Sequence, residues 1–266
     1  MLFYERAFGA QLQSRERQHA RQFTQWAGAQ SGAERTVLSL GDATLELLEF
    51  DYPGRPYPKG LSPYDSRFQH FGLVVTDMRR AMERLSQTEG WTAISTEGPQ
   101  TLPQSAGAVT AFKFRDPDGH PLEFLQFPNG KIPAHWRDHT GTSVFSGIDH
   151  SAICVTHIDR SVHFYEALGL HLSVRTLNRG FEQQRLDGIC DPQVDVIALA
   201  PSRPTPHVEL LHYRTVTPPP HENLASNDTA ATRLIFSTHE NLQEDTGRLM
   251  QDPDGHFLQV LDVVER

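Results

Sequence analysis

Two stretches of the chain share the same succession of apolar and polar positions. HFGLVVTDMRRAMERL begins at His70 and HSAICVTHIDRSVHFYEALG begins at His150, and each opens with a short apolar run that predicts a strand. Apolar residues then recur three to four positions apart, which predicts an amphipathic helix after each strand. Thr76 or Asp77 is suited to cap the first helix, and Gly169 is suited to the position that follows the second.

The same order of motifs occurs twice along the chain. The matching segments are FYERAFGAQL from Phe3 and FYEALGLHLS from Phe164, TLELLEF from Thr44 and HVELLHY from His207, and FRDPDGHPLEFLQF from Phe114 and LMQDPDGHFLQVLD from Leu249. We interpret the chain as a duplication with halves at residues 1–130 and 145–266. Each half divides into two modules, which gives four, at about residues 1–50, 68–127, 148–213 and 230–263.

Two Asp-Pro-Asp-Gly segments, at residues 116–119 and 252–255, predict tight turns. Proline presets φ at the second position, aspartate bonds to nearby backbone, and glycine adopts a positive φ without strain. Each turn is expected to lead into the last strand of its module.

Three glutamates lie within apolar strand-like runs: Glu46 in LELLEF, Glu123 in LEFLQF and Glu209 in VELLHY. Because side chains alternate between the two faces of a strand, each carboxylate shares a face with apolar neighbours. A buried carboxylate is costly unless it has a partner. We therefore expect a metal ion, an arginine or water in a cavity beside these glutamates.

Two histidines occupy equivalent positions at the start of the predicted strands. His70 shares a module with Glu123, and His150 shares a module with Glu209. Imidazole and carboxylate together suit Ni, Zn, Fe, Co or Mn better than Ca or Mg, which prefer sites made of oxygen alone. These histidines and glutamates are therefore candidate ligands for a divalent metal ion of unknown identity.

Composition narrows the classes of partner. The 266 residues carry 24 basic and 33 acidic side chains, a net charge of −9, and no long basic block. This balance disfavours nucleic acid and anionic membranes as partners. Only two cysteines occur, and neither a signal peptide nor a membrane-spanning apolar run is recognisable, so a cytoplasmic location is predicted.

Taken together, these motifs resemble the signatures of the glyoxalase/bleomycin-resistance/extradiol-dioxygenase superfamily, also called the vicinal oxygen chelate superfamily. The segments HFGLVVTD, HSAICVTH, the FYE motifs and DPDGH-x-LE carry the resemblance, which covers nearly the whole chain. It implies an α+β fold in which βαβββ modules form cup-shaped mixed sheets with helices packed outside. In such a cup, one metal ion binds two adjacent oxygens of the substrate.

Carried over to this chain, the resemblance implies a ligand set for each cup. His70, Glu123 and Glu46 would lie in the first cup, and His150 and Glu209 would lie in the second. Glu123 or Glu46 would also carry a proton as the catalytic group.

The chain departs from the family pattern in two places. No strand precedes the FYE motif at Tyr4, so the first strand of module one, with any ligand it would carry, is expected to be missing. In module four, Thr232 and Gln259 stand where module two has His70 and Glu123, and the spacing falls from 53 to 27 residues. The second cup is therefore expected to hold a half-site.

Which modules pair is open from the sequence. The repeat order favours pairing module one with module two, and then neither cup supplies the two histidines and one glutamate of an extradiol dioxygenase. Modules two and three are the complete ones. If these two paired instead, His70, Glu123, His150 and Glu209 would form one site with four ligands.

Three functions remain open. The first is a metal-dependent enzyme with glyoxalase-like or dioxygenase-like chemistry. The second is a metal-free protein of the bleomycin-resistance type, which would bind a small molecule against aromatic residues such as Trp91, Phe112, Phe114 and Phe124. The third is a truncated, inactive homologue, in which an unpaired sheet edge would favour a homodimer or aggregation.

Overall fold

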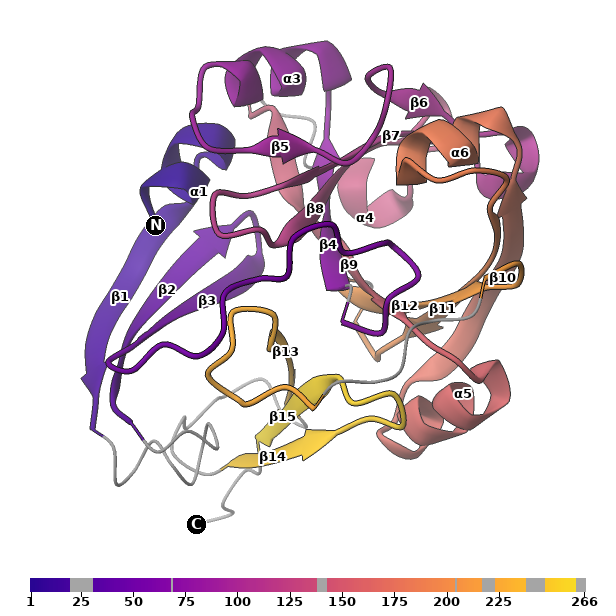
Figure 1. Ribbon diagram of the computed structural model, residues 1–266. Helices are drawn as coiled ribbons and strands as arrows, with labels where there is room; N and C mark the ends of the chain where they lie inside the picture. The colour runs from indigo at the N-terminus through magenta and orange to yellow at the C-terminus, as the bar shows by residue number, and fades with distance from the viewer. Residues whose placement is uncertain are drawn as a thin grey trace.

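The computed structural model describes residues 1–19, 31–67, 69–137, 143–203, 205–216, 223–237 and 247–261. They form one large mixed sheet, two three-stranded sheets and several short helices (Figure 1). This arrangement confirms the predicted α+β class with mixed sheets.

The large sheet contains nine strands in the order β10-β11-β12-β9-β4-β8-β7-β5, with β6 also paired to β7. The strands are β4 (Gln69–Val75), β5 (Thr92–Ala93), β6 (Gln100–Thr101), β7 (Thr110–Arg115), β8 (Pro121–Gln126), β9 (Phe145–Cys154), β10 (His171–Arg179), β11 (Gln193–Ala200) and β12 (His207–Tyr213). Strands β4 to β8 come from module two, and β9 to β12 come from module three.

Strands β4 and β9 join these two modules in an antiparallel pair, with His70 opposite Ala152 and Gly72 opposite His150. The expectation that module two pairs with module one is therefore wrong for the hydrogen-bonded sheet, and the alternative pairing is the one observed. The physical reason is that each complete module offers an apolar first strand, and these two strands satisfy each other's backbone groups.

Two helices cover one face of the large sheet. Helix α3 (Met78–Ser86) begins after Asp77, whose side chain accepts a hydrogen bond from the Arg80 amide at 3.0 Å. Helix α5 (Ile158–Ala167) is followed by Gly169 at φ 93°, as predicted. No helix of the described segments is long and apolar enough to cross a bilayer.

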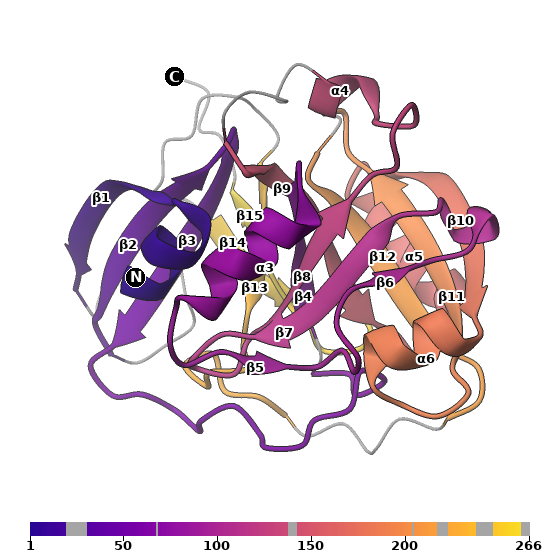
Figure 2. The same ribbon diagram turned by 90° about the horizontal axis from the view of Figure 1, so that it is seen from above.

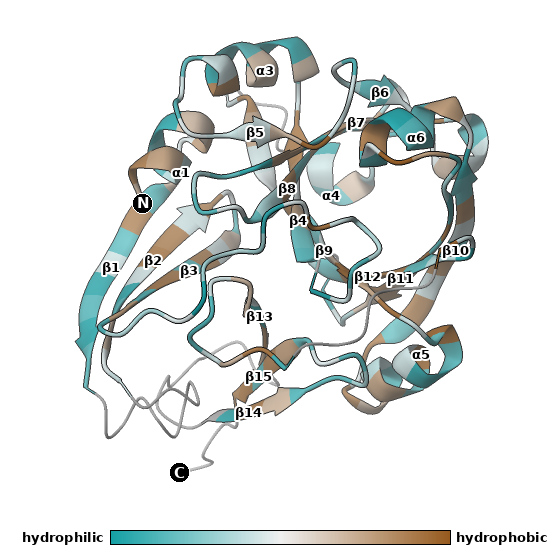
Figure 3. Cartoon of the chain, in the orientation of Figure 1, coloured by the Kyte–Doolittle hydropathy of each residue, from teal (hydrophilic) through white to brown (hydrophobic). Residues whose placement is uncertain are grey.

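Modules one and four each contribute a small sheet. The first consists of β1 (Gln11–Gln18), β2 (Ala33–Leu40) and β3 (Ala43–Phe50), and the second of β13 (Arg233–Ser237), β14 (Gly247–Gln251) and β15 (Phe257–Leu261). Strand β1 is mostly exposed and hydrophilic, which suits the edge of a sheet (Figure 3). Residues 238–246, within the shortened module four, lie outside the described residues.

The sequence duplication is also a duplication of contacts. Helix α1 (Leu2–Phe8) packs on module two, where the Tyr4 hydroxyl donates to the Asp116 carboxylate at 2.7 Å. Helix α5 repeats the contact toward module four, where the Tyr165 hydroxyl donates to Asp252 at 2.9 Å. All four side chains are buried. The helix of each odd module is thus anchored to the turn of the even module that follows it.

Both Asp-Pro-Asp-Gly segments form the predicted turns. Asp116 Oδ1 accepts from the amides of Asp118 at 3.0 Å and His120 at 2.8 Å, and Asp252 makes the same pair of bonds in module four. Gly119 has φ 97°, a value that only glycine adopts easily.

Helix α6 (Phe181–Asp187) links module three to the far edge of module two. The Ser95 hydroxyl donates to the Leu186 carbonyl at 2.9 Å, and the Thr96 amide donates to the Arg185 carbonyl at 2.8 Å. Figure 2 shows α6 beside β6 and β7. The short helices η1 (Gln104–Ala106) and α4 (Ala134–Arg137) complete the described elements.

The repeated tyrosine–aspartate contact can be tested by removing each hydroxyl. Tyr4→Phe and Tyr165→Phe should each lower the free energy of unfolding by about 1–3 kcal/mol, because a buried carboxylate loses its donor. The exposed Tyr52→Phe is the control and should change nothing. Urea denaturation measures all three variants, and equal stability of Tyr165→Phe and Tyr52→Phe would contradict this account.

Candidate metal centre

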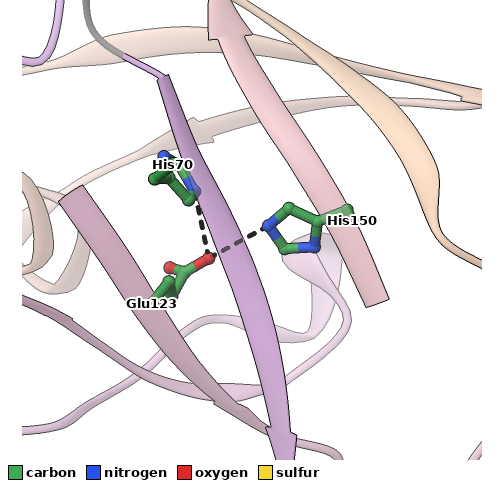
Figure 4. Close-up of side chains that lie close together, drawn as sticks. All are labelled: His70, Glu123 and His150. Carbon is green, nitrogen blue, oxygen red and sulfur yellow. Dashed lines mark ion pairs between the residues drawn. The ribbon is translucent and has the colours of Figure 1, made fainter. Parts of the chain in front are cut away.

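His70, Glu123 and His150 lie close together (Figure 4). The alternate residues of their strands pack in the cores beneath α3 and α5, so the three side chains are on the opposite face of the large sheet. They come from three adjacent strands: β4, β8 and β9. All three are buried, and their ligand atoms lie within 4.8 Å of one another. His70 Nε2 is 3.4 Å and His150 Nε2 is 3.3 Å from Glu123 Oε2.

Strand register brings these side chains together. Gly72 on β4 lies opposite both Glu123 on β8 and His150 on β9, so one row crosses all three strands. His70 is two residues earlier on β4 and therefore points to the same face. A Cβ at Gly72 would lie 2.4 Å from His150 Cε1, so only glycine leaves room for this imidazole. The sequence reading missed Gly72, although a lone glycine within a strand often marks such a close approach.

The arrangement fits a metal ion. His150 Nε2 is buried without a hydrogen-bond partner, yet it faces carboxylates of Glu123 at 3.3 Å and Glu209 at 3.8 Å. Ligand atoms about 2.1 Å from a tetrahedral zinc-like ion stand about 3.4 Å apart. The separations of Glu123 Oε2 from the two histidine nitrogens, 3.4 and 3.3 Å, match that spacing. The buried triad is therefore consistent with a divalent metal site.

A second group of residues orients His150. Asp149 Oδ2 is 3.2 Å from His150 Nδ1, and Asp149 Oδ1 accepts a hydrogen bond from the Trp136 indole at 3.0 Å. A proton on Nδ1 leaves Nε2 as the nitrogen that can bind a metal. His207 lies 3.4 Å from Glu209 and forms a second cluster with Asp149 and His150. The sequence reading missed both, although Asp149 directly precedes His150 and His207 shares a strand face with Glu209.

Charges in the site shift the pKa values of these groups. Burial alone would raise the pKa of Glu123, but the Lys113 ammonium and the two imidazoles hold it well below its usual range. Burial lowers the pKa of His70. For His150 burial acts in the same direction, yet the surrounding carboxylates, led by Glu209, raise its pKa well above the ordinary value. The carboxylates are thus ionised at neutral pH and available as ligands.

Glu46 requires a correction, because the structure does not bring it to this cluster. It lies on β3 in the first small sheet, where Arg35 binds it with two hydrogen bonds of 2.6 and 2.8 Å. The Arg35 side chain is only 7% exposed. Arginine is therefore the partner of this buried glutamate, and both carboxylate oxygens are engaged by it rather than available to a metal ion.

In module four, Gln259 occupies the position that corresponds to Glu123. It is fully buried, and neither atom of its amide has a hydrogen-bond partner. Among the described residues, both metal-type clusters include His150.

Lys113 is a further charged group that the sequence reading missed. It lies on β7 directly opposite Glu123, is buried, and forms an ion pair of 2.8 Å with Asp187 of α6. The signal was a lysine between Phe112 and Phe114, which is the same pattern that singled out the glutamates. Those two phenylalanines face the opposite way and pack in the core against the helices.

Comparison with known proteins places the chain in a family. The family model described as Glyoxalase/Bleomycin resistance protein/Dioxygenase superfamily matches residues 1–124 and 147–264. No curated protein sequence matches significantly.

Solved structures share the fold at low sequence identity. A variant of glyoxalase I from Zea mays is 18% identical with a TM-score of 0.56, covering 98% of this chain and 87% of its own. Unmodified glyoxalase I from Zea mays is 17% identical with a TM-score of 0.52, covering 98% and 86%. A candidate dioxygenase from Bacillus subtilis is 13% identical with a TM-score of 0.58, covering 97% and 79%. At such identities the likeness concerns the fold alone.

The family model spans most of the chain, and the sheet arrangement agrees with solved members of that fold. The chain therefore belongs to the glyoxalase/bleomycin resistance protein/dioxygenase superfamily.

Proposed function

We propose that the protein binds one divalent transition-metal ion through His70, Glu123 and His150, with Glu209 as a fourth ligand. With this ion it acts as an enzyme on a small molecule that has two adjacent oxygens. The observation that carries the proposal is the buried Nε2 of His150, which faces two carboxylates without a hydrogen-bond partner.

The donor set limits the metal. Two imidazoles and one or two carboxylates suit Ni, Zn, Fe, Mn or Co. When bound, such an ion polarises the substrate oxygens as a Lewis acid. The choice among these ions stays open.

The chain's own residues position and move protons around this centre. Asp149 and Trp136 hold the His150 ring so that Nε2 faces Glu123. Glu123 was expected to carry a proton, but Lys113 and two imidazoles stabilise its anionic form, which makes it a weak base. Burial would raise the pKa of Glu209, but the imidazoles of His150 and His207 lower it, so its anionic form is stabilised too. Glu209 is the better candidate on access, because its side chain is 21% exposed and lies 3.4 Å from His207.

Two classes of chemistry fit the same residues. His70, His150 and Glu123 form a set of two histidines and one carboxylate, which non-haem iron oxygenases use. Adding Glu209 gives the four-ligand set of a glyoxalase-like lyase or isomerase. If the protein binds iron and Glu209→Ala retains it, the dioxygenase-like class is favoured. If Glu209→Ala loses the ion, the glyoxalase-like class is favoured.

The other hypotheses have less support from the structure. The aromatic residues proposed for a metal-free site include Phe112, Phe114 and Phe124, and these belong to the core on the opposite face. Truncation, a homodimer, a cytoplasmic location and the domain division at residues 130–145 stay predictions. Superfamily membership agrees with a small-molecule ligand.

Metal content is the first test. The purified protein, loaded with Ni²⁺ or Fe²⁺ and then desalted, should retain about one ion per chain. His150→Ala should retain at least tenfold less, because it removes a central ligand. The matched control is His171→Ala, which alters an exposed histidine on β10 and should retain the ion fully. Elemental analysis by mass spectrometry measures both, and equal retention by the two variants would refute the site.

Metal affinity should also depend on pH. The ion binds the neutral imidazole of His150, whose pKa in the metal-free protein is raised well above 6.5. A proton must therefore leave on binding, so affinity should rise about tenfold per pH unit from 6.5 until the raised pKa is passed. Competition with a chelator at pH 6.5 and 7.5 measures this slope. Asp149→Asn should reduce the slope by lowering the pKa of His150, whereas a flat profile in the unmodified protein would contradict the assignment.

A further inference from the structure

Lys113 extends the row of site residues by one strand. The row runs from Lys113 on β7 through Glu123, Gly72 and His150 to His207 on β12, with each residue opposite the next. Residues that lie directly opposite one another point to the same face of the sheet. The Lys113 ammonium is therefore on the metal side of the sheet, beside a proposed ligand.

The hydrogen bonds of this ammonium are incomplete. Within the described part of the chain its one acceptor is Asp187 Oδ1 at 2.8 Å, although an ammonium has three donors. Asp187 is itself shared, since its Oδ2 accepts from Gln183 at 2.7 Å and from Tyr213 at 3.0 Å. The Lys113 side chain is only 5% exposed, so water does not readily supply the remaining acceptors.

A purely structural role explains this pair poorly. Helix α6 is already joined to module two by bonds from Ser95 and Thr96, which do not involve the Lys113 ammonium. Lys113 takes part there only through its backbone, whose amide donates to the Ser95 hydroxyl at 2.8 Å. Replacing a buried ion pair by apolar residues is often neutral or stabilising. A charged pair with two open donors beside a candidate metal site is better explained by a ligand.

We infer that Lys113 binds an anionic oxygen of the substrate, which makes the substrate class small 2-hydroxy or 2-oxo carboxylates. The inference rests on the proposed function, because the ion would take the hydroxyl or carbonyl and one carboxylate oxygen. The second carboxylate oxygen then meets the ammonium in a charge-assisted hydrogen bond. Glu123 and Glu209 offset the ion's double charge, and Asp187 offsets Lys113. Asp149 adds one negative charge, on the far side of the His150 ring from Nε2.

Two probes of nearly the same shape isolate this contact. Glycolate and hydroxyacetone both offer a hydroxyl and an adjacent oxygen to a metal. Where glycolate has its second carboxylate oxygen, hydroxyacetone has a methyl group. Isothermal titration of the Ni²⁺-loaded protein measures the ratio of the two affinities, in which a general change in metal binding cancels.

Three variants distinguish a role of Lys113 in ligand binding from a purely structural role of its ion pair with Asp187. Lys113→Met should weaken glycolate binding by about tenfold or more and leave hydroxyacetone unchanged. The double variant Lys113→Met/Asp187→Asn removes the unpaired buried carboxylate and should behave alike, which guards against poor folding of the single variant. Asp187→Asn alone should retain or strengthen glycolate binding, because Lys113 loses its competing acceptor.

The outcomes separate this inference from the metal proposal. If all three variants weaken the binding of both probes equally, the Lys113–Asp187 ion pair has a structural role and the inference is overturned. If the protein retains no Ni²⁺, the metal proposal fails, and the same ratio is taken from thermal shifts of the metal-free protein. Stabilisation by glycolate that disappears in Lys113→Met would then support the anion contact, and the absence of any glycolate response would overturn it.

Discussion

The antiparallel pairing of β4 with β9 is the contact on which the candidate site depends. Its register sets His150 beside Gly72 and Ala152 beside His70, and β8 adds Glu123 to the first of these rows. A slip of one residue would send one strand's site residues to the face covered by helices. Gly72 contributes by its missing side chain, since any other residue would occupy the volume that the imidazole fills.

The buried glutamates are neutralised by different positive groups in different modules. In module one, Glu46 is neutralised by Arg35, so this sheet gains an ion pair rather than a ligand site. In module two, Glu123 lies between imidazoles whose ring centroids are 5.6 Å apart, with Lys113 across the strand. The same residue type at the same repeat position thus has different chemistry. The difference comes from which positive groups the neighbouring strands supply.

Local signals in the sequence predicted much of the fold and several residues of the candidate site. Proline, glycine and aspartate preferences act within a few residues, so the turns at 116–119 and 252–255 and the cap at Asp77 were readable. Glu123 and Glu209 were also readable, because a glutamate among the apolar residues of a strand is visible within a few residues of sequence. Module pairing was not readable, because it depends on which strand edges meet in space, and the wrong pairing placed Glu46 in the site. Asp149, His207 and Lys113 were missed because their significance arises only across strands.

The proposed metal ion would lie between β4, β8 and β9. Anomalous diffraction from crystals of the Ni²⁺-loaded protein tests this most directly, since it locates the metal without reference to activity. We expect one strong peak about 2.0–2.2 Å from Nε2 of both histidines and an oxygen of Glu123. A peak centred elsewhere, or none at full metal loading, would contradict it.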